Sequence, residues 1–273
     1  MSYFVYNNKQ VYYEQFGQGK SIIVLNGLMM TTASWNAFKS ELSKQNRVIF
    51  VDFFDQGQTD KLVGENYNHD IQIELIRELM HHLELEKASI TGLSYGANIA
   101  LGFSVKYPDL VEKLVVYSAA SWTSPWLKNS GESWNKAALT KDGELYMSVT
   151  FANIYSPNFM EKNMEWMNNR KNTVINYFNS PGVLERMVRL TNSSESYNVR
   201  NKLKNIKSPT LIITGKQDYI TSVEEAKYLN DHIPNSDLIL IEGTGHTVVY
   251  EKPHLFITTL LGFINQETLK YNV

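Results

Sequence analysis

Short, continuous runs of apolar residues recur along this chain and are separated by segments of mixed polarity. A continuous apolar run is typical of a strand that is buried on both faces of a parallel sheet. We therefore predict buried strands at residues 22–25, 48–51, 88–91, 114–117, 210–214 and 238–241. Before them, residues 3–6 and 11–15 flank the turn-prone pair Asn7-Asn8, which predicts a hairpin.

Segments with apolar residues at helical spacing lie between these strands. Helices are predicted near residues 34–44, with Thr31 or Thr32 as the cap, and from residue 70 to residue 83, with Asp70 as the cap. Further helices are expected after residue 95 and near 223–229 and 254–265. This alternation predicts an α/β fold on a mostly parallel sheet.

The alternation is interrupted once. Residues 121–208 form a predicted helical stretch that is rich in Asn, Met and aromatic residues. We interpret this stretch as a helical cap inserted into an α/β-type core, and residues 1–120 and 209–273 form that core.

Composition narrows the function classes. The chain has 273 residues, of which 26 are Lys or Arg and 28 are Asp or Glu, so its formal charge of −2 does not support nucleic-acid binding. The absence of cysteine excludes disulfides, thiolate metal sites and a cysteine nucleophile. The six histidines show no metal-binding spacing, so neither a metal nor another cofactor is expected.

The N-terminus lacks the pattern of a secretory signal, and the chain has no run of about 18 apolar residues that would span a membrane. We therefore expect a cytoplasmic protein. The sequence does not indicate its oligomeric state.

The most informative motif is Gly92-Leu93-Ser94-Tyr95-Gly96, which fits Gly-x-Ser-x-Gly. An apolar run precedes it and a helix-compatible run follows. Small residues on either side of a sharp strand-to-helix turn allow the two elements to cross closely. The turn would expose the Ser94 hydroxyl and place the amide of Tyr95 at a helix N-terminus, which suits nucleophilic attack on a carbonyl.

A serine nucleophile needs a base and an acid that orients the base. Because functional groups gather at the carboxyl ends of strands in open α/β sheets, the loops after the predicted strands are the places to search. Asp218 is the only acid in the loop that follows residues 210–214, and His246 lies in a glycine-bearing loop after residues 238–241. The alternative roles are a turn or helix cap for Asp218 and an ordinary loop residue for His246. The order Ser94, Asp218, His246 favours a catalytic triad.

Taken together, these motifs resemble the α/β-hydrolase superfamily over nearly the whole chain. The resemblance rests on Asn26-Gly27-Leu28, residues 52–60, residues 92–96, Gly215-Lys216-Gln217-Asp218, and Gly245-His246 followed by Glu251-Lys252-Pro253. It implies an eight-stranded, mostly parallel sheet with one antiparallel strand, a cap inserted after the sixth strand, and an oxyanion hole formed by the backbone amides of Leu28 and Tyr95.

The chain departs from the family pattern at two places. Asn26-Gly27 stands where His-Gly is usual, and the segment after residue 51 lacks the usual arginine and first glycine, which Phe54 and Asp55 replace. The second departure removes a customary structural ion and alters the pocket wall. Neither removes the predicted triad.

The predicted cap carries large apolar side chains that suit the roof of a pocket for an uncharged or weakly polar acyl compound. We expect the substrate-binding residues to include Trp122, Trp126, Met147 and Phe151. Alternatively, Glu161, Glu165 or Glu185 would receive a substrate amine. The leading hypothesis is a cofactor-free serine hydrolase of esterase type that acts on a small molecule. The alternatives are an acyl transferase with the same triad and a regulatory protein that senses a small molecule.

Overall fold

The protein is described by a computed structural model that covers residues 2–266. Its centre is one eight-stranded sheet in the order β1-β2-β4-β3-β5-β6-β7-β8. The strands are β1 (Ser2–Tyr6), β2 (Lys9–Phe16), β3 (Lys20–Leu25), β4 (Asn46–Val51), β5 (Ala88–Leu93), β6 (Val111–Tyr117), β7 (Thr210–Gly215) and β8 (Ser236–Ile241). β2 runs antiparallel to both of its neighbours, and the pairs from β4 to β8 are parallel. The predicted fold class, with one antiparallel strand, is confirmed.

The first hairpin also forms where the pattern predicts it. Asn7 and Asn8 have φ angles of 52° and 59°, so both turn residues lie in the left-handed region. Asparagine tolerates this region better than other residues with a Cβ, and such turns match the twist of paired strands.

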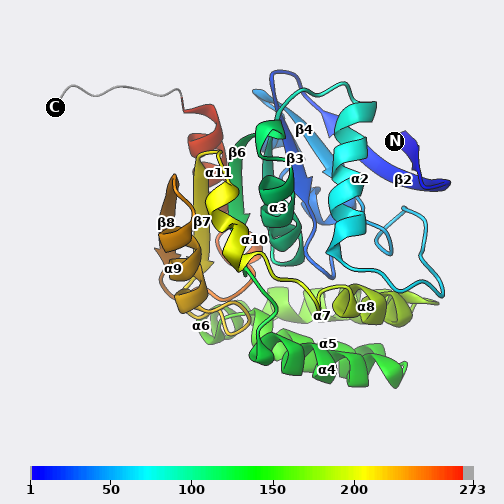
Figure 1. Cartoon of the computed structure of the whole chain (residues 1–273). Helices are drawn as coiled ribbons and strands as arrows, with labels where there is room; N and C mark the ends of the chain where they lie inside the picture. Colours follow the sequence, from blue (N-terminus) through cyan, green and yellow to red (C-terminus); the bar gives the residue numbers. More distant parts are fainter. Residues whose placement is uncertain (1, 267–273) are drawn as a thin grey trace.

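The helical elements connect the strands or lie between β6 and β7 (Figure 1). They are η1 (Thr32–Trp35), α1 (Lys39–Leu42), α2 (His69–His82), α3 (Tyr95–Lys106), η2 (Pro108–Leu110), α4 (Pro125–Leu139), α5 (Gly143–Ile154), α6 (Pro157–Lys162), α7 (Met164–Phe178), α8 (Val183–Asn192), η3 (Arg200–Asn205), α9 (Val223–His232), α10 (Val248–Glu251) and α11 (Pro253–Asn265).

The cap predicted at Thr31 is confirmed as the N-cap of η1, but the extent of the first predicted helix and the start of the second were wrong. The helix expected at residues 34–44 is split into η1 and α1, because Trp35 turns inward and donates its indole N–H to Asn26 Oδ1 at 2.7 Å. The second helix begins at His69, not after a cap at Asp70. Asn68 is its cap, and its side chain accepts a hydrogen bond from the Asp70 amide at 2.9 Å. Asp70 instead lies in the first turn, where a carboxylate also suits the helix dipole.

Both faces of the sheet are buried, as the continuous apolar runs require. One face packs against α2, α3 and α9, and its core contains Ile23, Ile90 and Val116. The other face packs against η1, α1 and α11, and its core contains Val24, Phe50 and Phe256. Alternate residues of each strand thus face opposite helical layers.

The inserted helices, α4 to α8, form a layer across the edge of the sheet at which β5 ends and Ser94 follows it (Figure 1). The two chain segments that connect this layer to the sheet lie side by side, since Trp122 and Asn198 form an antiparallel bridge. The boundaries of a separate cap at residues 121 and 208 remain a prediction. Within residues 2–266, no helix combines the length and the hydrophobicity that crossing a bilayer requires.

Candidate active site

Ser94 occupies a sharp turn between β5 and α3. Its φ and ψ angles are 55° and −116°, a conformation that a residue with a side chain rarely adopts. The flanking glycines make this turn possible. A Cβ on Gly92 would lie 2.5 Å from the Gly96 carbonyl, and a Cβ on Gly96 would lie 2.5 Å from the Leu25 carbonyl oxygen. Each glycine is therefore required by a close backbone approach, and the turn presents Ser94 beyond the end of the sheet.

Three side chains from different loops meet at this turn. The Ser94 hydroxyl oxygen lies 2.7 Å from His246 Nε2. On the other side of the imidazole, Nδ1 lies 2.9 Å from Asp218 Oδ2 and 3.0 Å from Oδ1. Ser94, Asp218 and His246 follow β5, β7 and β8 respectively, so the parallel sheet brings them to one edge. The arrangement permits a proton to pass from the serine hydroxyl to the imidazole.

The Asp218 carboxylate is buried within a set of hydrogen-bond donors. It accepts from the amides of Ile220 and Thr221, at 2.9 and 2.8 Å, and from the Thr221 hydroxyl at 2.8 Å. Burial alone would raise the pKa of this carboxyl, but the facing His246 imidazole and the Thr221 hydrogen bonds outweigh it and hold the pKa below its usual value. The group is therefore an anion at neutral pH and can stabilise an imidazolium.

The loop after β3 carries Leu28, and hydrogen bonds from the Asn26 and Gln56 side chains stabilise this loop. Asn26 donates from Nδ2 to the Val51 carbonyl at 2.9 Å and to Gln56 Oε1 at 3.1 Å. Gln56 in turn donates to the carbonyls of Gly27 and Leu28, at 2.9 and 3.3 Å. These hydrogen bonds explain how asparagine can replace the histidine of the family pattern at position 26. The Asn26 amide satisfies the Val51 carbonyl and holds Gln56, which in turn orients the Leu28 peptide.

A buried carboxylate also supports the loop that carries His246. Glu251 accepts hydrogen bonds from the amides of Gly245 and Ser156, each at 3.1 Å, and from the Thr247 hydroxyl at 3.2 Å. No supporting role was predicted for Glu251, which entered the sequence analysis only within the motif Glu251-Lys252-Pro253. The structure connects it to the segment between α5 and α6, so the histidine loop and the inserted helices are held together.

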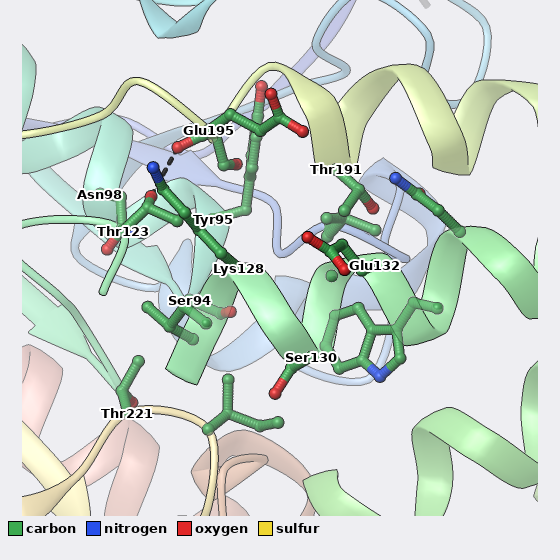
Figure 2. A pocket seen from close by; sticks show the side chains of 17 residues that line it. Ser94, Tyr95, Asn98, Thr123, Lys128, Ser130, Glu132, Thr191, Glu195 and Thr221 are labelled. Carbon is green, nitrogen blue, oxygen red and sulfur yellow. Dashed lines mark hydrogen bonds between the residues drawn. The ribbon is translucent and has the colours of Figure 1, made fainter. Parts of the chain in front are cut away.

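Two cavities open on Ser94, and Leu28 and Trp134 line both of them. The first is lined mainly by polar residue types and lies between the sheet edge, α4 and the end of α8. Figure 2 shows Ser94 between Thr221 below it and Lys128, Glu132, Thr191 and Glu195 above it. The second is mostly apolar and also reaches His246. Its lining includes Met29, Phe151, Ile154, Arg170, Val174, Phe178 and Tyr250.

The structure divides the residues that were expected to bind substrate. Phe151 lines the apolar cavity beside Ser94. Trp122 and Trp126 lie along a separate hollow near Arg200 and Glu225, and Trp126 donates its indole N–H to the Tyr219 carbonyl at 2.8 Å. Met147 is buried in the core and lines neither of the two cavities at Ser94. Trp126, in the first turn of α4, and Trp122, in the segment before α4, therefore lie away from the cavities at Ser94.

Two features of the site were not anticipated from the sequence. Neither Trp134 nor Arg170 was predicted to line the site. Arg170 lies in a row at four-residue spacing with Trp166, Val174 and Phe178 on α7, and such a row faces one side of a helix. A single arginine within an apolar row was the signal that could have identified it. Among residues 2–266, no cluster of three or more His, Asp or Glu side chains could hold a metal ion.

Comparisons with known proteins agree with the observed fold. The sequence pattern of the alpha/beta hydrolase fold matches residues 20–253. The AB hydrolase superfamily protein YisY of Bacillus subtilis (strain 168) is 27% identical over 267 residues, which cover 93% of this chain and 95% of that protein. MGS-M2, an alpha/beta hydrolase enzyme from a Medee basin deep-sea metagenome library, has a solved structure that is 43% identical, with a TM-score of 0.97 and complete coverage of both chains (100%). A hydrolase from Pseudomonas aeruginosa PA01 shares the fold at 20% identity, with a TM-score of 0.85 and coverage of 97% and 98%. The chain belongs to the α/β-hydrolase fold family.

Proposed function

We propose that this α/β-fold hydrolase is a serine esterase that cleaves a carboxylic ester, or a related acyl compound, through an acyl-enzyme on Ser94. The observation that carries the proposal is the continuous hydrogen-bonded contact from Ser94 through His246 to Asp218, with 2.7 Å between the serine oxygen and the imidazole. Such a contact serves to activate a hydroxyl that is otherwise a weak nucleophile.

In the proposed mechanism, the Ser94 oxygen attacks the substrate carbonyl while His246 Nε2 takes its proton. Asp218 orients the imidazole and stabilises its positive charge. The backbone amides of Leu28 and Tyr95 stabilise the oxyanion, and the position of Tyr95 as the first residue of α3 adds the favourable end of the helix dipole. His246 then returns the proton to the leaving alcohol and later activates the water that releases the acid.

The cavities support a small acyl compound as the substrate. The mostly apolar cavity favours a hydrocarbon portion beside Ser94, and the polar cavity offers room for the other portion of the ester. In this proposal residues 121–208 act as the cap that roofs the site. Phe151 and Trp134 would contact the substrate, and no cofactor takes part.

The direct test compares the native protein with Ser94→Ala on a series of short and long acyl esters and with a fluorophosphonate probe. We expect Ser94→Ala to lose at least about three orders of magnitude in kcat and all labelling. Ser40→Ala, on the exposed surface of α1, is the matched control and should behave as the native protein. Equal esterase activity in Ser94→Ala, or no labelling of the native protein, would contradict the proposal.

An acyl transferase would use the same three side chains, with an alcohol or thiol acceptor in place of water. Product analysis in the presence of such acceptors separates the two reactions. Hydrolysis predicts the free acid as the main product, and transfer predicts the new ester or thioester.

A further inference from the structure

The apolar cavity beside Ser94 contains one arginine. Arg170 extends from α7, one of the two longest helices of the inserted layer, into a mostly apolar lining that includes Phe151, Ile154 and Val174. The same cavity is lined by Ser94 and His246. A guanidinium is positively charged at every physiological pH, so a fixed positive charge stands in the space that the substrate must enter.

Nothing in the lining neutralises this charge. The lining of the cavity includes no Asp or Glu. Within residues 2–266, Arg170 Nε is buried without a hydrogen-bond partner, and so is the hydroxyl of Tyr250, which lines the same cavity. The Arg170 guanidinium instead lies over the Tyr250 ring, 4.8 Å from its centre. The lining therefore offers the Arg170 guanidinium neutral hydroxyl groups, among them those of Tyr155 and Tyr250, but no anionic acceptor.

An arginine elsewhere in the inserted helices shows the contrast. Arg189 of α8 donates to both carboxylate oxygens of Asp55, at 2.9 and 2.5 Å. A buried donor that lacks a partner destabilises the folded protein, so an arginine is normally placed where a carboxylate meets it. The lining of the cavity gives Arg170 no such carboxylate, so an anionic partner for this guanidinium has to come from a bound molecule.

We propose that the substrate carries a carboxylate that binds Arg170, at the opposite end of an apolar spacer from the ester that Ser94 attacks. The proposal rests on the proposed esterase function and names its substrate class. The planar guanidinium matches the two oxygens of a carboxylate, the Tyr250 hydroxyl can donate to the same group, and the spacer contacts Phe151, Ile154 and Val174. Arg170 is then a specificity-determining residue that acts on the part of the substrate that does not react.

The test uses pairs of esters that differ in one charge. Monomethyl esters of the dicarboxylic acids from succinate to suberate are compared with the corresponding dimethyl esters, and acetate esters of ω-hydroxy acids place the carboxylate on the alcohol side. The native protein should have a higher kcat/KM for the charged ester at one or more chain lengths, and the preferred series shows which side carries the carboxylate. In Arg170→Met the ratio of charged to neutral kcat/KM should fall about 10- to 100-fold, as loss of a charge-assisted hydrogen bond predicts.

Arg170→Lys keeps the charge but not the planar fork, so its ratio should lie between those of the native protein and Arg170→Met. Arg77→Met is the matched control, because Arg77 lies on the exposed surface of α2 and pairs with Glu74, and its ratio should equal that of the native protein. A native protein that prefers the neutral ester at every length, or an unchanged ratio in Arg170→Met, would overturn the proposal.

Failure of the esterase function is recognised separately. If the native protein hydrolyses neither ester, calorimetry of the Ser94→Ala protein with monomethyl adipate replaces turnover. Binding that is lost when Arg170→Met is added supports the carboxylate site. Binding of equal strength in both variants, or no binding to either, rejects it.

Discussion

Asp55, in the loop after β4, forms a two-point ion pair with Arg189 of α8. The distances are 2.9 Å from Arg189 Nε to Oδ2 and 2.5 Å from Nη2 to Oδ1, and the Tyr67 hydroxyl donates to Oδ2 at 2.8 Å. Asp55 has a φ angle of 68°, which explains why glycine is usual at this position in the family. In this chain Asp55 replaces that glycine, and its carboxylate connects the loop after β4 to α8 of the inserted helices.

Arg189→Met should therefore destabilise the protein strongly. The Asp55 side chain is fully buried (0% exposed), so removal of its partner leaves an uncompensated carboxylate, which costs about 3–5 kcal/mol. Urea unfolding of the native protein and the variant measures the difference. The control is Lys44→Met, which breaks the solvent-exposed pair with Glu41 and should change stability by less than about 1 kcal/mol. Similar losses in both variants would show that the Asp55 pair has no special structural role.

Two glycine substitutions test the close approach at the serine turn. A Cβ on Gly96 would lie 2.5 Å from the Leu25 carbonyl oxygen, so Gly96→Ala should cost about 1–3 kcal/mol and lower kcat by displacing Ser94. Gly262, within α11, has nothing within 4 Å of its Cβ position. Gly262→Ala should instead stabilise the protein, by about 0.5–1 kcal/mol, because alanine favours the helix. Thermal unfolding and esterase kinetics of both variants measure the contrast.

His69 should make the folded protein sensitive to acid. Burial lowers the pKa of its imidazole from 6.5 to about 3, so between these values the unfolded chain binds a proton that the native protein does not. Stability must then fall as the pH drops from about 6.5 toward 3. Between pH 7 and pH 5 the native protein should lose about 2 kcal/mol more than His69→Gln.

Urea unfolding at several pH values checks this difference. His254→Gln, which removes an exposed imidazole at the start of α11, should keep the native pH dependence. An identical acid sensitivity in His69→Gln would show that His69 does not take up a proton on unfolding.

Asn26 should affect both stability and turnover. Asn26→Ala removes the acceptor of the buried Trp35 indole N–H and the donor to the Val51 carbonyl. Loss of such partners costs about 1–3 kcal/mol each. Because the Asn26 network also orients the Leu28 peptide, we expect kcat to fall more than KM rises. The control is Thr91→Val on β5, which removes a buried hydroxyl that has no partner within residues 2–266 and should be neutral or stabilising. A rise in KM alone would contradict the role of Asn26 in positioning the oxyanion loop.

The hydrophobic pattern predicted most of the architecture because burial on two faces leaves a clear local signature. The strands at residues 22–25 and 210–214 were located to within two residues of β3 and β7. The single helix predicted at residues 34–44 did not form. The local pattern of this segment suited one helix, but the contact between Trp35 and Asn26, which no local pattern records, divides it into η1 and α1. The cap of α2 was predicted wrongly for a related reason, because Asn68 and Asp70 are both good candidates and the path of the preceding chain selects one.

For the candidate site, the sequence by itself determined which loops carry Ser94, Asp218 and His246, because parallel strands bring their carboxyl ends to one edge. It also determined that a glycine must stand on each side of the serine turn. Only the tertiary structure decided which aromatic side chains face the serine, and it directed Phe151 toward the cavity and Trp122 and Trp126 elsewhere. It alone paired Arg189 with Asp55 and placed Arg170 in a cavity whose lining has no carboxylate. Such outcomes depend on how helices far apart in the chain pack against one another, and no local pattern records that.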